Sequence, residues 1–217
     1  MTRCQSKAES RQHFRALRAQ QLPIVEAAVV QEVIRNVHQL TSSSSPKGQG
    51  QGHLGIYWPL AGEVDLRSLK QKLKQPIALP ASGTDGSLTY HPWSLAPLQL
   101  DACNILAPLR EPALEPSGLN LLLIPALAID QHGIRLGYGG GFYDRLRSQP
   151  KWRAVTTLAV LPQACITHEP LPRDPWDIPV DGWITETGLA NSNHLTKSNE
   201  ATQSNDVIKS NDITKPN

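Results

Sequence analysis

The residues best suited to chemistry lie in one stretch, RLGYGGGFYDR, which runs from Arg135 to Arg145. Four of the five positions from Gly137 to Gly141 are glycine, and two aromatic residues, an aspartate and an arginine follow. Because glycine has no Cβ, a ligand can approach this backbone closely, and successive N–H groups can form a concave anion site. The segment FYDRLR can begin a helix, whose N-terminus would favour an anion further. The stretch therefore predicts a loop that binds phosphate.

Other site motifs are missing from the sequence. A dinucleotide fingerprint needs a sixth-position glycine where Phe142 stands, and no GK pair is followed by Ser or Thr as in a Walker loop. A glycine-rich turn without a ligand is the alternative. The histidines show no HxxxH or HExxH spacing, and no GxSxG or cysteine nucleophile arrangement occurs. We expect no zinc site and interpret His91 and His132 as ordinary surface or loop residues.

Two apolar runs predict the strands that must position this loop. NLLLIPALAID (Asn120 to Asp130) and VTTLAVL (Val155 to Leu161) are typical of strands buried on both faces, as in a parallel sheet covered by helices. HLGIYWP (His53 to Pro59) and PIALP (Pro76 to Pro80) predict two further strands. The glycine-rich stretch follows the first apolar run, where open α/β sheets place their ligands.

Helical spacing predicts three helices before the glycine-rich stretch. Apolar residues recur at this spacing between Pro23 and Leu40, with Pro23 in the first turn. Lys7 to Arg18 predicts a separate, earlier helix. DLRSLKQKL predicts a short helix capped by Asp65. Strands alternating with helices indicate an α/β fold, a single three-layer domain with a mostly parallel sheet covered by helices.

Composition sets the remaining boundaries. The 217 residues suit one domain, which we place at residues 1–189 with a mobile polar loop at about 41–52. Residues 190–217 lack the apolar content to order themselves and predict a disordered polar tail. A net charge of +2, with the two signs interleaved, favours neither a nucleic-acid nor a membrane partner.

The cysteines and the N-terminus indicate the compartment. Cys4, Cys103 and Cys165 are odd in number and far apart, which favours a reducing compartment over a disulfide framework. The N-terminal segment has no apolar run for a signal peptide. We therefore expect a cytoplasmic protein.

The stretch RLGYGGGFYDR, preceded by LLLIPALAIDQHG and followed by WDIPVD, resembles the 5-formyltetrahydrofolate cyclo-ligases, also called 5,10-methenyltetrahydrofolate synthetases. The resemblance extends from about Lys7 to Glu186 and includes the segment YWPLAGEVD. It implies conversion of 5-formyltetrahydrofolate to 5,10-methenyltetrahydrofolate, with ATP as co-substrate, Mg²⁺ as cofactor, and ADP and phosphate as products. It also implies that the formyl oxygen is phosphorylated before the folate N10 attacks.

The resemblance assigns a role to each matching residue. Lys7 and Arg11, four apart on one helix face, would contact ATP phosphates. The other ATP-binding residues would be Arg135, Leu136, Gly137, Tyr138, Gly139, Gly140, Gly141, Phe142 and Tyr143. The folate would contact Trp58, Glu63, Tyr138, Gly139, Gly140, Gly141 and Phe142. Asp144 and Asp177 would bind Mg²⁺, with Asp174 an equal rival of Asp177 on spacing alone.

One departure from the family concerns the glycine run itself. Many members carry a basic residue there, whereas this chain has Tyr138 and Gly140. A phosphate contact is then missing or supplied elsewhere.

Each of these residues also has a reading without function. Lys7 and Arg11 could form a solvated basic face, Arg135 a surface ion pair, and Asp177 a turn. Asp144 could simply stabilise a helix N-terminus, and Glu63 could be an exposed acid before a helix. Trp58, Phe142 and Tyr143 could pack in the core.

Two other function classes remain open at this stage. The chain could be a nucleotide- or anion-binding regulatory module, or an ATP-dependent enzyme acting on another small carbonyl or carboxylate compound. We expect a monomer whose partners are 5-formyltetrahydrofolate and ATP.

Overall fold

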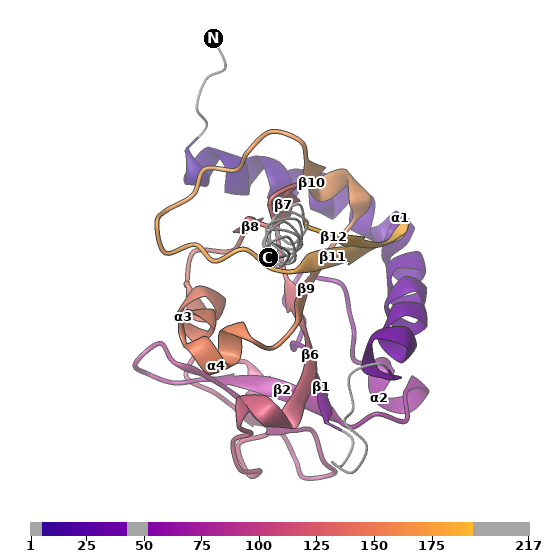
Figure 1. The fold of residues 1–217 in the computed structure, drawn as a ribbon, viewed down its shortest axis with the longest axis vertical. Helices are drawn as coiled ribbons and strands as arrows, with labels where there is room; N and C mark the ends of the chain where they lie inside the picture. Colours follow the sequence, from indigo (N-terminus) through magenta and orange to yellow (C-terminus); the bar gives the residue numbers. More distant parts are fainter. Residues whose placement is uncertain (1–5, 43–51, 193–217) are drawn as a thin grey trace, which may run out of the picture.

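The computed structural model describes residues 6–42 and 52–192, and its centre is a seven-stranded sheet in the order β12-β11-β9-β6-β1-β2-β3 (Figure 1). The five inner strands run parallel, and β3 and β12 run antiparallel at the two edges. This arrangement confirms the predicted α/β fold. The strands are β1 (His53–Gly55), β2 (Ile77–Ser82), β3 (Leu88–Pro92), β6 (Leu119–Pro125), β9 (Thr157–Val160), β11 (Gly182–Thr185) and β12 (Gly188–Asn191).

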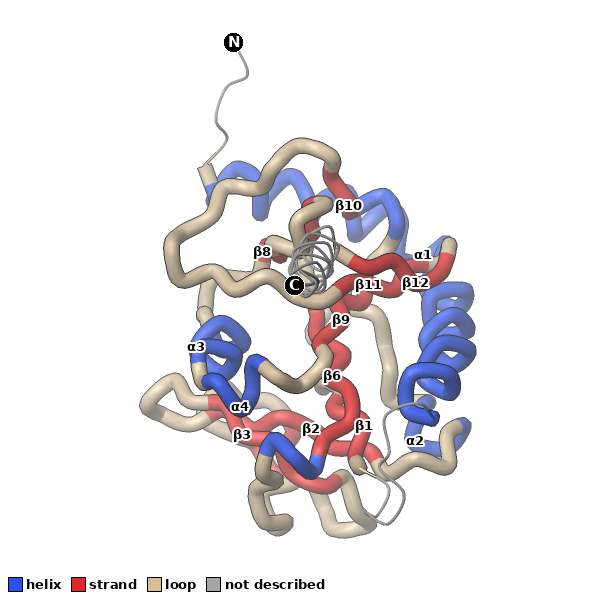
Figure 2. Tube along the Cα trace, in the orientation of Figure 1, coloured by secondary structure: helices blue, strands red, loops and turns tan. Residues whose placement is uncertain are grey.

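Smaller elements surround this sheet (Figure 2). A three-stranded sheet contains β10 (Ile166–Thr167), β7 (Ala128–Asp130) and β8 (Arg135–Leu136), and β4 (Gln99–Leu100) pairs with β5 (Leu106–Ala107). The helices are α1 (Lys7–Ser42), α2 (Leu69–Lys72), α3 (Phe142–Ser148) and α4 (Pro150–Arg153), with short 3-10 helices η1 (Pro116–Gly118) and η2 (Gln163–Cys165). None of these described helices has the length and apolar character that a membrane crossing requires.

Strand β6 shows why the sheet is covered on both faces. Leu122 and Ile124 pack into one buried cluster with Leu146 of α3, whereas Leu121 and Leu123 pack into a second. The second cluster is completed by apolar residues of α1 and α2. Alternate side chains of a strand point to opposite faces, so a strand between two helical layers is apolar at nearly every position.

The N-terminal helices differ from the prediction. One helix, α1, spans Lys7–Ser42 and contains Pro23, so the expected division into two helices is wrong. Figure 1 shows that α1 changes direction along its length, and an interior proline is a common cause of such a bend. Proline removes one helical hydrogen bond. Burial of Leu22 before it and Val29 after it holds both parts against the sheet.

The apolar run from Asn120 to Asp130 forms two strands, not one. Strand β6 ends at Pro125, and β7 begins at Ala128 in the three-stranded sheet. Pro125 has no N–H to continue a ladder. Because both strands and the residues between them are buried, the apolar pattern gave no sign of the break.

Several element boundaries also needed correction. Strand β1 covers only His53–Gly55 of the predicted HLGIYWP strand. Asp65 does not cap α2, which begins at Leu69; its carboxylate instead accepts the Arg67 N–H at 2.9 Å and pairs with the Arg67 guanidinium.

The chain is ordered beyond the predicted domain boundary. Residues 190–191 pair with β11, and the buried Ser192 hydroxyl donates to the Val180 carbonyl at 2.9 Å, so disorder from residue 190 is wrong for these positions. The rest of the predicted tail, most of the predicted mobile loop (43–51) and Cys4 lie outside the described residues. Cys103 and Cys165 are both free thiols.

Candidate functional site

A pocket of about 710 Å³ collects segments that are far apart in the sequence. Its walls come from the start of α1, the segment after β1, the β2–β3 hairpin, the glycine-rich stretch and the segment before β11. Every residue assigned a role from the sequence lines it, namely Lys7, Arg11, Trp58, Glu63, Arg135, Leu136, Gly137, Tyr138, Gly139, Gly140, Gly141, Phe142, Tyr143, Asp144 and Asp177, together with the rival Asp174.

The glycine-rich stretch joins β8 to α3 through backbone angles that favour glycine. Gly139 has φ of 111° and Gly141 has φ of 65°, both in the region that other residues rarely adopt. Among the described residues, none accepts a hydrogen bond from the backbone N–H groups of residues 138–141. These four donors line a pocket wall, so they are available to a ligand.

Two arginines hold the stretch by its carbonyl oxygens. Arg11 Nε donates to the Gly137 carbonyl at 3.0 Å. Arg145 Nη2 donates to the Gly140 carbonyl at 2.8 Å and its Nε to the Gly86 carbonyl at 2.9 Å. The loop is therefore tied to α1 on one side and to the β2–β3 turn on the other.

Arg135 forms an ion pair, but not at the surface. Its side chain is 6% exposed, its Nη2 lies 2.9 Å from Asp144 Oδ2, and its guanidinium lies 5.3 Å from the centre of the Tyr143 ring. Its buried Nε has no partner among the described residues. A buried donor without a partner lowers stability, so this guanidinium is suited to bind a further anion.

Lys7 is paired with both candidate metal ligands of the WDIPVD region. Its Nζ lies 2.7 Å from Asp174 Oδ2 and 2.6 Å from Asp177 Oδ2. Burial alone would lower the pKa of Lys7, but the hydrogen bonds and charges of the two carboxylates raise it above its usual value. The structure therefore does not choose between Asp174 and Asp177, since both hold the same ammonium group.

Glu63 is buried, contrary to the reading of an exposed acid. It is 6% exposed, and its Oε2 accepts the Leu60 N–H at 2.8 Å. Its Oε1 has no partner among the described residues. Burial raises the pKa of Glu63, although the Leu60 amide, Arg18 and Tyr138 act in the opposite direction.

Aromatic side chains lie around this acid. Trp58 packs edge-to-face on Trp93 with ring centres 5.9 Å apart, and the Arg67 guanidinium lies 5.0 Å from the Trp58 ring. The buried Tyr57 hydroxyl has no partner among residues 6–42 and 52–192. A flat ring with polar edges would find both stacking surfaces and hydrogen-bond partners here.

Sequence reasoning missed Arg18 and the pocket residues Tyr57, Arg145 and Trp176. Arg18 is 4% exposed, lies over the Tyr138 ring and donates to its hydroxyl. Burial, as the largest cause, raises the pKa of Tyr138 to about 12. A signal existed for Arg18: the helix predicted from Lys7 to Arg18 already places it on the same face as Lys7 and Arg11.

No group of three or more His, Cys, Asp or Glu side chains able to hold a metal ion occurs in the described part of the chain. This does not match an all-protein metal cage. Mg²⁺ in nucleotide sites commonly uses one or two carboxylates and completes its shell with water and phosphate.

Comparisons with known proteins agree with this picture. A model of the 5-formyltetrahydrofolate cyclo-ligase family matches residues 3–186. The 5-formyltetrahydrofolate cyclo-ligase of Escherichia coli K12 is 33% identical over 143 residues, which cover 61% of this chain and 76% of that protein. The enzyme of that name from Haemophilus influenzae is 26% identical and covers 81% of this chain and 95% of its own length.

Solved structures show the same fold. The NMR structure of Aquifex aeolicus 5,10-methenyltetrahydrofolate synthetase matches with a TM-score of 0.68 and 27% identity, covering 86% of this chain and 93% of that chain. A 5,10-methenyltetrahydrofolate synthetase from Mycoplasma pneumoniae matches with a TM-score of 0.62 at 18% identity, covering 84% and 99% of the two chains.

Proposed function

Because the chain belongs to the 5-formyltetrahydrofolate cyclo-ligase family, we propose that its pocket binds ATP and 5-formyltetrahydrofolate side by side and transfers the γ-phosphoryl group to the formyl oxygen. The cyclo-ligase activity itself is that of the family and its named relatives. We propose further that one end of the pocket binds the nucleotide phosphates and the other binds the folate ring.

The phosphate end is the glycine-rich stretch with its cations. The free N–H groups of residues 138–141 supply donors, and Arg11 and Arg135 supply positive charge beside them. Phosphoryl transfer requires mainly positioning and stabilisation of charge on the phosphate oxygens. Lys7 joins this set when a phosphate competes with the two carboxylates that hold it.

The ring end is built around Glu63. The pterin ring of a folate carries an N–H and an amino group on one edge, which are donors for the unpaired Glu63 Oε1. Trp58 and Phe142, which also line the pocket, would contact the flat faces of the ring. A folate held in this way would present its N5-formyl group toward the glycine-rich stretch.

The proposed reaction has two steps, phosphorylation of the formyl oxygen and closure of the ring by N10. An N-formyl group is an amide, so its oxygen is a poor leaving group until it carries a phosphoryl group. The folate N10 then attacks the formyl carbon, a C–N bond forms, and the C–O bond breaks with release of phosphate. N10 loses its proton, and the product carries the positive charge of the methenyl bridge. The phosphorylated formyl group must be kept from water until N10 attacks.

The carboxylates near the phosphate end fit a hydrated divalent ion. Asp144 lies at the end of the glycine-rich stretch, and Asp177, which pairs with Lys7, lines the same pocket. We propose that these two residues hold Mg²⁺, which when bound neutralises charge on the nucleotide phosphates. Asp144 would then exchange part of its contact with Arg135, which is left free for phosphate.

The observation that carries this proposal is the meeting of the glycine-rich stretch and the buried Glu63 in one pocket. The test is the absorbance of methenyl folate after mixing the protein with 5-formyltetrahydrofolate and Mg²⁺, with and without ATP. We expect a rise only with ATP. No rise despite ATP binding would favour a regulatory module, and ADP release with another small acid would favour a different substrate.

A further inference from the structure

A tight turn presents one aromatic ring at the rim of the pocket. In the segment Asp174 to Asp177, the Asp177 N–H donates to the Asp174 carbonyl at 3.0 Å, which closes a four-residue turn. The Asp174 N–H donates to Asp177 Oδ2 at 2.7 Å, and Pro175 at the second position fixes its own φ. Trp176 occupies the third position, so its backbone is held on both sides.

The same turn is anchored to α1. Lys7 Nζ binds both turn carboxylates, at 2.7 Å for Asp174 and 2.6 Å for Asp177. Before a nucleotide binds, the turn is therefore attached to the helix that carries the phosphate-end cations. Figure 1 shows this segment, coloured orange between β10 and β11, passing beside the start of α1.

Trp176 differs from the other tryptophans of the chain. Trp152 and Trp183 are buried at 7% and 5% exposure, and Trp58 and Trp93 pack on each other. Trp176 is 67% exposed, lines the pocket, and makes no ring or cation contact with any described residue. A large aromatic side chain left exposed on a rigid support at a ligand pocket is pre-organised for a flat ligand group.

The position of Trp176 relative to Arg11 and Lys7 indicates which ligand carries the flat group that it contacts. Arg11 contacts Gly137, and Lys7, one turn of α1 before Arg11, binds the turn that carries Trp176. The contacts along this end of α1 therefore run from the N–H cradle at Arg11 to Lys7 and the turn with the exposed ring. A nucleotide has the same order, with phosphates at one end and a flat base at the other.

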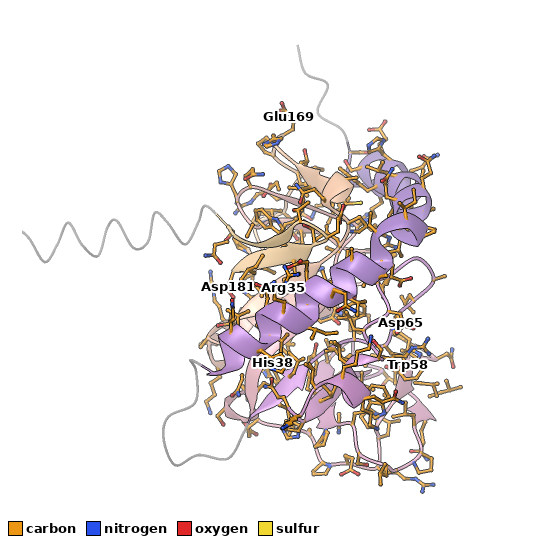
Figure 3. The ribbon with its side chains drawn as sticks, turned by 90° about the vertical axis from the view of Figure 1, so that its right-hand side faces the viewer. Arg35, His38, Trp58, Asp65, Glu169 and Asp181 are labelled. Carbon is orange, nitrogen blue, oxygen red and sulfur yellow. The ribbon has the colours of Figure 1, made fainter. Side chains whose placement is uncertain are left out.

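The second flat ligand already has partners on another segment of the pocket wall. Glu63 and Trp58 lie on the segment that follows β1, and Figure 3 shows Trp58 in the lower half of the molecule, below Glu169. The folate ring therefore does not need Trp176.

We propose that Trp176 is the base-binding residue of the nucleotide site and stacks on the purine ring of ATP. This inference rests on the proposed function, because it assumes that the phosphates lie on the glycine-rich stretch. Stacking uses the π-face that every base has, so it discriminates weakly between bases. Stacking on Trp176 would therefore contribute about equally to the binding of GTP and of ATP.

The test compares ligands with and without a base. Binding of Mg²⁺-ADP and of inorganic tripolyphosphate is measured by calorimetry for the wild type, Trp176→Ala and Trp176→Phe. We expect Trp176→Ala to weaken ADP between about 5- and 150-fold and to leave tripolyphosphate unchanged. Trp176→Phe should recover most of the ADP affinity. Leu95→Ala, which also removes an exposed apolar side chain but lies outside the pocket, should bind both ligands as the wild type does.

Fluorescence gives an independent measurement on a variant that retains an aromatic ring. ADP should quench tryptophan emission in the wild type and not in Trp176→Phe, whereas tripolyphosphate should quench neither. Unchanged ADP affinity in Trp176→Ala would overturn the inference and leave the proposed function standing. Equal weakening of both ligands would also overturn it, because Trp176 would then only position the turn. A wild type that binds neither ligand would contradict the proposed function as well.

Discussion

The two ends of the pocket differ in how their polar groups are satisfied before a ligand binds. At the phosphate end the charged side chains form ion pairs, in which Lys7 holds Asp174 and Asp177 and Arg135 holds Asp144, although the N–H groups of residues 138–141 and the buried Arg135 Nε have no partner among the described residues. At the ring end Glu63 Oε1 and the Tyr57 hydroxyl have no partners among the described residues.

This difference implies two modes of binding. A nucleotide must replace existing ion pairs, so its affinity is a difference between old and new contacts. A folate ring instead forms hydrogen bonds with buried polar groups that have no partner, and that already destabilise the fold, when no ligand is bound. We therefore expect substitutions at the phosphate end to change turnover and nucleotide affinity, and those at the ring end to change folate affinity and stability in opposite directions.

The largest effect is expected for Asp144→Ala. It removes the carboxylate proposed for Mg²⁺ and leaves the buried Arg135 guanidinium without its partner. We expect a loss of turnover of at least about 100-fold, the scale of a lost electrostatic contact in a transition state. Turnover measured against Mg²⁺ concentration checks this, with Asp65→Ala as a control carboxylate outside the pocket. Normal turnover at low Mg²⁺ would refute the assignment of Asp144.

Glu63→Gln should next weaken folate binding by about 10- to 100-fold in KM, as expected when a charged acceptor becomes neutral, with little change in KM for ATP. Folate KM measured against pH checks the role of the charge. Because burial raises the pKa of Glu63, we expect wild-type affinity to fall on acidification at a higher pH than for an exposed glutamate. Glu63→Gln should abolish this pH dependence.

The raised pKa of Glu63 also predicts an effect on stability. A carboxyl whose pKa is higher in the folded than in the unfolded protein binds more protons when folded, so it costs stability as pH rises through the folded pKa. At neutral pH without ligand, Glu63→Gln should therefore have a higher Tm than the wild type. A lower Tm together with a higher folate KM would show that Glu63 stabilises the fold instead.

Arg11→Ala should raise KM for ATP by about 10-fold, the scale of one charge-assisted hydrogen bond, and leave folate KM unchanged. Steady-state kinetics with each substrate varied in turn separate the two. Arg35→Ala is the matched control, because Arg35 lies on the same helix, is exposed and pairs with Glu32 outside the pocket. If both substrates' KM values rise equally in Arg11→Ala, the two ends are not independent.

The smallest effect on either end is expected from shortening the C-terminus. Ending the chain after Ser192 should leave both KM values and Tm unchanged. Ending it after Gly188 removes most of β12 and the Ser192 hydrogen bonds, and should lower stability by about 1–3 kcal/mol without changing the ratio of the two KM values. Thermal unfolding of the two truncated proteins provides the comparison.

The sequence predicted the parts of the fold whose pattern is local. The apolar strands β6 and β9 and the helix after the glycine-rich stretch are confirmed, because burial on both faces leaves a continuous apolar run. The break at Pro125 and the continuous path of α1 through Pro23 were not predictable in this way. Both depend on what packs against the proline, which is a tertiary property.

The candidate site was predictable as a set of residues but not as a set of contacts. The glycine-rich stretch and the family resemblance named residues that all line one pocket. Spacing could not show that Lys7 binds Asp174 and Asp177, which are 167 and 170 residues away. Nor could it show that Trp176 is exposed at the rim, because an aromatic residue in a loop is equally typical of core packing.

The most direct test of the proposed mechanism follows the formyl oxygen atom through the reaction. The two ends of the pocket are proposed to meet at this atom, which is phosphorylated and then leaves with phosphate. With ¹⁸O in the formyl group of 5-formyltetrahydrofolate, mass spectrometry of the products should find the label in inorganic phosphate after a single turnover. Label in water, with unlabelled phosphate, would contradict phosphorylation of the formyl oxygen and with it the proposed division of the pocket.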